Sequence, residues 1–317
     1  MKEKILKRQR LLFYFFFILA LLFSGSAGQQ KVRPEVPYVP TPDEVVREML
    51  KMAEVNANDL LYDLGCGDGR IVVTAAKEIG CRGVGIDIDP DRIEESKKNA
   101  KEAGVEDKVQ FFLMDLFDVD LSDASVVTLY LLSKVNLRLR PKLFRELRAG
   151  ARVVSHDFSM GNWRADKSTV VEEKLLNYKS ARDPLSFSDY WDKHNVYFWI
   201  IPANASGVWE WTMPDLTGDT RCSVLIEQTF QEIDGKALEG CLNVEIKDGK
   251  IAGSSLNFSI ERENHGHDQR IHYEGHIEGH TMRGSYEIEG TGGVKRKWEA
   301  KRVPSTMKAI DSDSNLK

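Results

Sequence analysis

A glycine-rich turn at residues 63–70, DLGCGDGR, limits the folds open to this 317-residue chain more than any other feature. It follows the apolar run 60–62 and precedes RIVVTAAKEIG, whose apolar spacing predicts a helix that ends at Gly80. A strand, a glycine turn and a helix in this order are typical of a parallel α/β sheet, where backbone N–H groups at the helix start can approach a ligand. The turn therefore predicts both a fold class and a ligand site.

The alternation of strands and helices continues from residue 37 to about residue 202. Further apolar runs predict strands at 82–87, 108–113, 125–132, 151–158 and 196–202. Strands this apolar are covered on both faces. We therefore expect an α/β fold with a Rossmann-like, doubly wound, mostly parallel sheet.

Two helix starts carry capping signals. TPDE at 41–44 predicts a helix with Thr41 as N-cap and Glu44 completing a capping box. Asp89 followed by Pro90 predicts a second start, and Gly104 predicts the end of that helix.

The pattern changes near residue 207, where short alternating runs are separated by turns such as DGK at 234–236. These runs predict a smaller antiparallel β domain, either a sandwich or a barrel, with a lipocalin-like barrel as one form. The charged segment 164–192 is interpreted as an insertion. The predicted parts are listed in chain order: a signal peptide or anchor at 1–28, an α/β domain at 29–206, a β domain at 207–304 and a disordered tail at 305–317.

The N-terminus has the layout of a targeting segment. Basic residues within the first ten positions precede the uncharged run 11–23, and the small residues SGSAG follow it. This order favours a signal peptide cleaved after Ala27, and the alternative is an uncleaved anchor that associates with a membrane through 11–23. Either interpretation predicts an exported protein, periplasmic or secreted, or a membrane-anchored one.

Charge and cysteine content limit the partners. The net charge is −5, so no basic surplus supports a nucleic-acid partner. The four cysteines have no metal-ligand spacing. Cys222 and Cys241 lie on neighbouring predicted strands, where they would form a disulfide in an exported protein or stay as buried thiols.

The residues of the glycine turn argue against a dinucleotide. Arg70 stands where a dinucleotide site needs its third glycine, and a pyrophosphate would meet the carboxylates of Asp63 and Asp68. S-adenosylmethionine suits the acids better, because its sulfonium and ammonium groups are positive and its ribose offers two hydroxyls. Asp87 lies about 20 positions after Gly65, the spacing of a ribose-binding acid. Asp115, beyond the third strand, is placed to reach the adenine edge or is a solvated loop carboxylate.

At these residues the chain resembles the class I S-adenosylmethionine-dependent methyltransferases. PYVPTP at 37–42, DLGCGDGRIV at 63–72, GARVVSHDF at 150–158 and Trp163 more narrowly resemble the seven-stranded protein-lysine methyltransferases of mitochondrial inner-membrane proteins and their bacterial relatives. The resemblance implies that Asp63, Gly65 and Gly67 hold the methionine end of the cofactor and Asp87 the ribose. It also implies that Tyr38 and Thr41 fold over the cofactor.

The fourth strand ends in LYLLSKVN and lacks the Asn-Pro-Pro-Tyr of many amino-group methyltransferases. Tyr130 and Asn136 are the candidate residues to line the channel of the methyl acceptor, with a core aromatic and a helix cap as the structural alternatives. His156 and Asp157 would suit a general base. Because direct displacement needs no base, we expect a hydrogen-bonded structural role for them.

Histidines are densest at 265–280, HGHDQRIHYEGHIEGH. In a strand, His272, His276 and His280 share one face while Ile271 and Ile277 share the other. We therefore expect an amphipathic strand here, and no metal site in the chain. The aromatic residues Trp209, Trp211 and Phe230 are expected in the core.

These observations predict a methyltransferase that transfers a methyl group in line from S-adenosylmethionine to a protein lysine. A small-molecule methyltransferase is the second hypothesis. The third is an exported ligand-binding protein with a non-catalytic methyltransferase fold.

Overall fold

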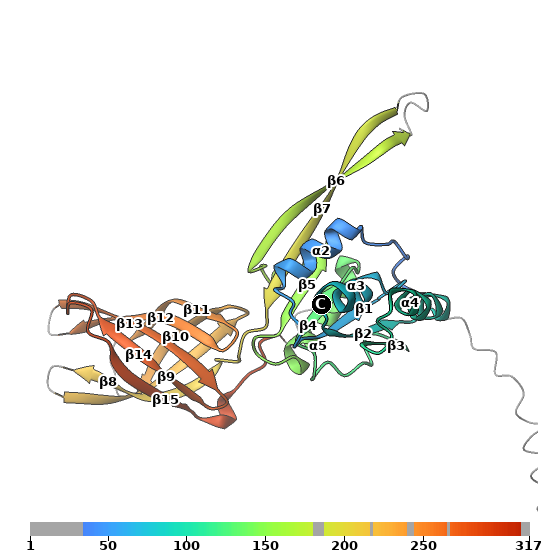
Figure 1. The fold of residues 1–317 in the computed structure, drawn as a ribbon. Coiled ribbons are helices and arrows are strands. Elements are labelled where there is room, and N and C mark those ends of the chain that lie inside the picture. The colour runs from blue at the N-terminus through green and yellow to red at the C-terminus, as the bar shows by residue number, and fades with distance from the viewer. Residues whose placement is uncertain (1–33, 180–186, 216–217, 240–243, 265–266, 312–317) are drawn as a thin grey trace, which may run out of the picture. The chain divides into compact units, whose positions relative to one another are not determined.

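The computed structural model describes residues 34–179, 187–215, 218–239, 244–264 and 267–311. Seven strands form one sheet in the order β3-β2-β1-β4-β5-β7-β6 (Figure 1). Its parallel strands are β1 (Leu60–Leu64), β2 (Arg82–Asp87), β3 (Val109–Leu113), β4 (Val126–Leu129) and β5 (Arg152–His156). β6 (Lys167–Lys179) and β7 (Phe187–Ile200) run antiparallel to their neighbours.

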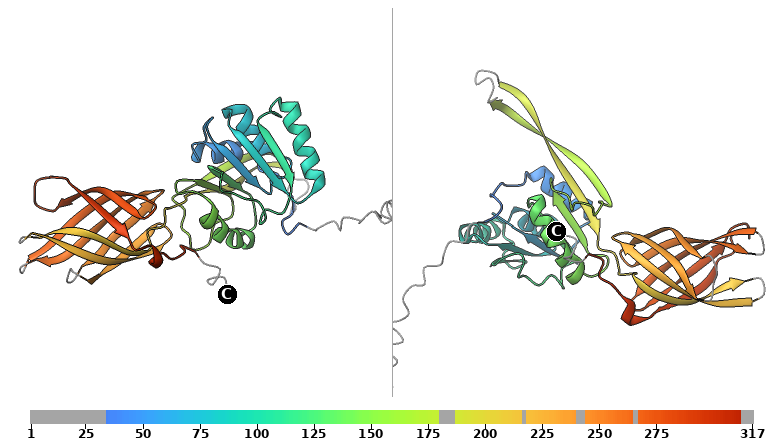
Figure 2. Two further views of the ribbon diagram at one scale, coloured as in Figure 1. Left: turned by 90° about the horizontal axis from the view of Figure 1, so that it is seen from below. Right: turned by 180° about the vertical axis from the view of Figure 1, so that it is seen from behind.

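Helices cover both faces of this sheet (Figure 2). The helical elements are α2 (Asp43–Met52), α3 (Arg70–Thr74), the π-helical turn η1 (Ala75–Ile79), α4 (Pro90–Ala103) and α5 (Ser133–Glu146). Neighbouring strand residues point to opposite faces, so Val126 of β4 packs with α2, α3 and α4 whereas Val127 packs with α5. The predicted doubly wound sheet is confirmed.

The two predicted helix starts have different outcomes. Asp89 caps α4 as expected, because its side chain accepts a hydrogen bond from the Asp91 N–H, and Gly104 ends the helix in the left-handed conformation. The prediction for Thr41 and Glu44 is wrong. Pro42 occupies the N-cap position of α2 without a side-chain cap, and the Thr41 hydroxyl instead lies 3.2 Å from Nδ1 of His156.

The charged segment interpreted as an insertion belongs largely to a β-hairpin. β6 and β7 pair from Lys167↔Phe198 outward, and Figure 1 shows the hairpin continuing beyond the other strands. Residues 180–186 lie outside the described residues.

The second half is a closed antiparallel barrel, which decides between the predicted sandwich and barrel. Its strands are β8 (Gly207–Asp215), β9 (Gly218–Thr229), β10 (Glu232–Glu239), β11 (Glu245–Ala252), β12 (Ser255–Asn264), β13 (His267–Glu278), β14 (Thr281–Ile288) and β15 (Arg296–Arg302). β15 pairs with β8 and closes the ring, with Ala300 opposite Trp211. β9 and β10 are joined by a turn at Phe230, whose φ is +55°.

Aromatic residues of the second half are buried as expected, although in two different cores. Trp209 and Trp211 lie in the barrel interior. Phe230 packs instead in the core that contains α5, where its ring centroid is 5.7 Å from that of Phe144 and 6.1 Å from that of Trp163. One barrel residue thus completes the core of the seven-stranded sheet.

The segment after the barrel is ordered further than the sequence suggests. A disordered tail is predicted from residue 305, but a 3-10 helix, η2, spans Pro304–Thr306. Asp311 is buried, and its Oδ2 forms a 2.6 Å ion pair with Nε of Arg140 in α5. Residues 312–317 lie outside the described residues.

The cysteines take two states. Cys66 and Cys81 are free and buried, whereas Cys222 is disulfide-bonded. Cys241 and the predicted signal peptide or anchor lie outside the described residues.

Within the described ranges, no helix has both the length and the apolar character needed to cross a membrane.

Candidate active site

The glycine turn leaves no room for side chains. Gly65 and Gly67 have φ values of +81° and +54°, a region that other residues rarely adopt. A Cβ on Gly67 would lie 2.5 Å from the ring of Tyr38, and one on Gly65 would lie 2.9 Å from Cδ2 of Leu131. The turn is therefore a bare-backbone cradle enclosed by the Tyr38 segment and the end of β4.

Asp87 is held rigidly beside this turn. Its Oδ2 accepts a 2.8 Å hydrogen bond from the Gly67 N–H, and its Oδ1 accepts a 2.9 Å bond from the Asp89 N–H. Each carboxylate oxygen can accept two hydrogen bonds, so one acceptor position on each oxygen is left for a ligand. The two backbone bonds fix the direction of those positions.

Asp63 is buried below the turn in β1. The Thr128 hydroxyl donates a 2.8 Å hydrogen bond to its Oδ1. Burial, opposed by the hydrogen bond from Thr128 and assisted by the negative charges of Asp87 and Asp68, raises the pKa of Asp63 to about 7. A cation placed here would stabilise the charged carboxylate, as the ammonium of S-adenosylmethionine would.

Asp68 does not offer the free charge that the sequence suggested. Burial acts to raise the pKa of Asp68, but hydrogen bonds and the charge of Arg70 outweigh burial and lower it. The Arg70 guanidinium lies 2.7 Å from Oδ2 of Asp68 and donates a 2.9 Å bond to the Thr41 carbonyl. Arg70, the residue that excluded a dinucleotide motif, thus fastens the Tyr38–Thr41 segment to the turn.

The hydrogen bonds described for Asp115 do not involve the glycine turn or Asp87. Asp115 is exposed two positions beyond β3, and its Oδ1 accepts a 2.9 Å hydrogen bond from the Phe117 N–H. The apolar side chains of Phe112, Leu113 and Met114 are exposed just before it. This edge offers an apolar surface and a carboxylate together.

Tyr130 and Asn136 both meet the residues that follow β5. The Tyr130 ring lies over the His156 imidazole, with centroids 3.8 Å apart. Asn136 is fully buried inside α5, so the helix-cap alternative is wrong, and its Nδ2 donates a 3.0 Å hydrogen bond to the Phe158 carbonyl. Tyr130 is half-buried and can reach a ligand, whereas Asn136 holds the chain behind it.

A histidine pair lies under Tyr130. Nε2 of His156 is 3.0 Å from Nδ1 of His194 in β7. Burial lowers the pKa of His156 to about 4, against the raising effect of Asp157. Sequence reasoning missed His194, because its partners come from elsewhere in the chain and no local motif marks it. His272 and His276 of β13 are exposed as predicted.

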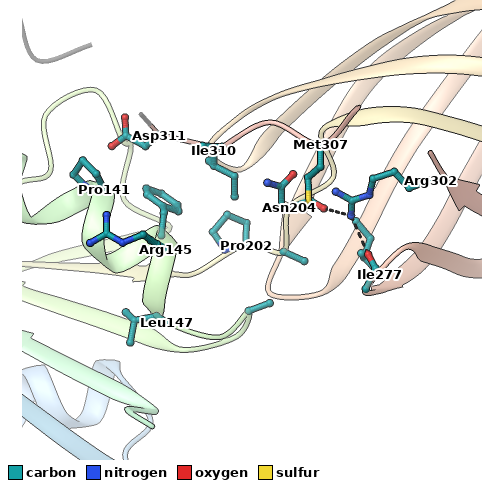
Figure 3. Close-up of a pocket in the computed structure, with 15 residues that line it drawn as sticks. Pro141, Arg145, Leu147, Pro202, Asn204, Ile277, Arg302, Met307, Ile310 and Asp311 are labelled. Carbon is teal, nitrogen blue, oxygen red and sulfur yellow. Dashed lines mark hydrogen bonds between the residues drawn. The ribbon is translucent and has the colours of Figure 1, made fainter. Parts of the chain in front are cut away.

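A pocket elsewhere in the fold contains none of these residues. Figure 3 shows it lined by Pro141 and Arg145 of α5, by Pro202 and Asn204, and by Met307 after the barrel. The cofactor residues lie at the carboxyl ends of the parallel strands, where ligands of open α/β sheets bind. We therefore place the candidate active site at the glycine turn.

Known proteins share this half of the chain. Residues 63–167 match the family model of the ANTKMT methyltransferase domain. A protein-lysine N-methyltransferase of Saccharolobus islandicus is 47% identical over 169 residues, which are 53% of this chain and 95% of that protein. A lysine N-methyltransferase of Homo sapiens, named for an ATP synthase subunit, is 34% identical over 134 residues, 42% of this chain and 57% of that protein. This chain thus spans little more than half the length of the human protein.

A solved structure from Salinibacter ruber, described as an RNA methyltransferase in complex with S-adenosyl-L-homocysteine, is 50% identical. It covers 52% of this chain and 94% of its own, with a TM-score of 0.44. The bare glycine turn and the carboxylates of Asp63 and Asp87 fit S-adenosylmethionine, and the Saccharolobus protein is matched over nearly its whole length. The chain belongs to the family of class I protein-lysine N-methyltransferases, enzymes that use S-adenosylmethionine as cofactor.

Proposed function

We propose that this protein methylates a lysine side chain of a protein substrate at the carboxyl ends of β4 and β5. The supporting observation is the contact between the end of β4 and the glycine turn. The side chain of Leu131, which follows Tyr130 just after β4, packs where a Cβ of Gly65 would lie. Tyr130 and the nearby Phe158 then offer aromatic faces to an acceptor amine.

In this proposal each predicted site residue has one task. Asp63 binds the ammonium of the cofactor, and Asp87 binds the ribose hydroxyls. Gly65 and Gly67 give the backbone room, and Tyr38 with Thr41 covers the turn. Asp115 is assigned to the adenine edge, and Asn136 positions the chain behind Tyr130.

The protein's contribution to the reaction is orientation and exclusion of water. The bound cofactor supplies an electrophilic methyl group for in-line displacement, so no nucleophilic side chain is needed. The acceptor lysine must first lose a proton, and its ordinary pKa is about 10.4. Apolar and aromatic surroundings favour the neutral amine.

The substrate class is proposed from the relatives and the N-terminus. The similar proteins include lysine methyltransferases named for an ATP synthase subunit and for the adenine nucleotide translocase. We propose a membrane-associated protein as substrate, and an exported or membrane-anchored enzyme that uses residues 11–23 for targeting. Mass spectrometry of the mature N-terminus separates the two forms, because cleavage after Ala27 leaves a chain that begins at Gly28.

The test of the activity uses the full chain with methyl-labelled S-adenosylmethionine. Membrane proteins, soluble proteins, RNA and a small-molecule extract are offered in separate reactions. The proposal expects label on protein lysines, located by peptide mass spectrometry, and a loss of label with Asp87→Ala. Label only on RNA or only on small molecules would overturn it. Tyr130→Phe should keep most of the activity, since the ring remains, while Tyr130→Ala should lose it.

A further inference from the structure

Three side chains below Tyr130 form a set that the methyl transfer does not use. His156 and Asp157 end β5, and His194 comes from the adjacent strand β7. Nε2 of His156 lies 3.0 Å from Nδ1 of His194 and 3.3 Å from Oδ2 of Asp157. The remaining separation, between Nδ1 of His194 and Oδ2 of Asp157, is 3.8 Å. Within the described ranges, this is the one set of three such groups close enough to share an ion.

These separations match the spacing of ligands around one small ion. In a tetrahedral zinc site with metal–ligand distances of about 2.0 Å, the ligand atoms lie about 3.3 Å apart. The three separations lie on both sides of that value. Two imidazoles and one carboxylate are also ligands that zinc prefers, and three protein ligands leave a fourth position for water.

Two of the atoms that point away from the shared centre are held by partners behind them. Nδ1 of His156 lies 3.2 Å from the Thr41 hydroxyl, and Oδ1 of Asp157 accepts a 2.8 Å bond from the Asn195 N–H. Nε2 of His194 is buried and lacks a hydrogen bond within the described structure, with carboxylate oxygens of Glu173 and Asp192 at 3.7 and 3.8 Å. Outer partners of this kind orient the ligands of metal sites.

The backbone and the surroundings also suit a built site. Asp157 has a φ of +58°, an uncommon conformation that turns its Oδ2 toward the histidines. The side chains of His156 and His194 are 0% and 11% exposed, whereas that of Asp157 is 25% exposed. The ligand atoms are thus shielded, with an opening to solvent at the carboxylate.

We propose that His156, Asp157 and His194 bind one divalent transition-metal ion, with zinc as the best match. The ion would tie β5 to β7 and, through His156 and Thr41, to the segment that covers the glycine turn. It would lie beneath the ring of Tyr130, so it would position the acceptor side of the active site. This inference does not depend on which substrate is methylated.

The test is zinc binding to the full chain without a histidine tag, after removal of metal with a chelator. Calorimetry with Zn²⁺ alone should give one ion per chain at micromolar affinity or tighter. Asp157→Asn, which tolerates the positive φ, and His194→Gln should each weaken binding by about 100-fold or more, since even outer partners contribute about 10- to 100-fold. The control is His276→Gln on the exposed face of β13, which should bind as the wild type does.

A second readout does not need the variants to be equally stable. Zinc should raise the melting temperature of the wild type and of His276→Gln, and should leave that of Asp157→Asn unchanged. If the wild type binds no zinc at micromolar concentration, the histidine pair is only hydrogen-bonded and the proposal fails. It fails equally if both ligand variants bind zinc as tightly as the wild type.

Discussion

In the seven-stranded sheet, buried polar side chains collect at the ends of the central strands, whereas the barrel fills its interior with aromatic rings. The sheet buries Asp63, Thr128, Ser155 and His156 near the carboxyl ends of β1, β4 and β5. The barrel buries Trp209, Trp211, Phe258, Tyr273 and Trp298, and it turns His272 and His276 of β13 outward. Burying polar groups costs free energy unless they are paired, so their concentration in one region marks where binding and chemistry take place.

The largest effect expected on the sheet side is that of Gly67→Val. The new side chain would collide with the Tyr38 ring at a backbone conformation that valine does not tolerate, so cofactor affinity should fall by more than about 100-fold. Gly279→Val is the matched control, because Gly279 has a similar φ of +58° but nothing near its Cβ. Calorimetry with S-adenosylmethionine measures both. Equal losses in the two variants would show that backbone strain, and not the cradle, is responsible.

The variant Phe230→Ala tests whether a barrel residue contributes to the stability of the sheet without contributing to cofactor binding. Removing a buried phenylalanine typically costs about 3–5 kcal/mol of unfolding free energy, and here the loss falls on the core around Phe144 and Trp163. We expect lower stability in urea with nearly unchanged cofactor affinity. Leu238→Ala, at an exposed position of β10, is the control. A destabilisation no larger than that of the control would mean that this contact contributes nothing.

Asp87→Ala should have a smaller effect than Gly67→Val. It removes hydrogen bonds to a charged group, which are worth about 1.5–3 kcal/mol, so affinity for S-adenosylmethionine should fall about 10- to 150-fold. Asp107→Ala, an exposed acid before β3, should bind normally. Wild-type affinity in Asp87→Ala would remove Asp87 from the site.

The smallest effect is a pH dependence from Asp63. Its pKa is raised from 3.8 to about 7 in the ligand-free fold, so the folded chain holds a proton that the unfolded chain releases. This group therefore stabilises the fold fully below about pH 4, and the contribution is lost as the pH rises through about 7. Binding of a cation expels the proton, so cofactor affinity should fall as the pH drops below 7, by at most about tenfold per unit.

Asp63→Asn is the control for this linkage. The asparagine oxygen can still accept from Thr128 but does not titrate, so both pH dependences should disappear. Calorimetry in buffers of different ionisation enthalpy reports the released proton directly. If wild type and variant depend on pH in the same way, the titrating group is another residue.

Local signals in the sequence predicted the parts of this fold that depend on neighbouring residues. The glycine turn, the Asp89 cap and the alternating faces of β13 involve residues a few positions apart, and the structure confirms them. The Thr41 cap was wrong because a distant imidazole, His156, takes its hydroxyl. His194 was missed for the same reason, since only the pairing of β5 with β7 brings it to His156.

Tertiary burial decided the remaining differences. No pattern in the sequence shows that Asp63 is buried deeply enough to raise its pKa. Closure of the barrel likewise depends on β15, whose alternation of charged residues with Trp298 and Ala300 gives a weak strand signal. These features follow from contacts between segments far apart in the chain.

The ion pair between Arg140 and Asp311 makes assembly of the sheet depend on a residue synthesised long after it. During translation α5 (residues 133–146) is synthesised before the barrel. The Asp311 carboxylate that pairs with Arg140 of this helix is synthesised only after the barrel. The two side chains are only 4% and 3% exposed, and breaking such a pair typically costs about 3–5 kcal/mol. A chain that stops before Asp311 would retain every residue of the candidate active site, but the buried Arg140 guanidinium would keep only the neutral acceptors Met160 and Asn162. Premature termination would therefore lower the stability of the first half of the protein.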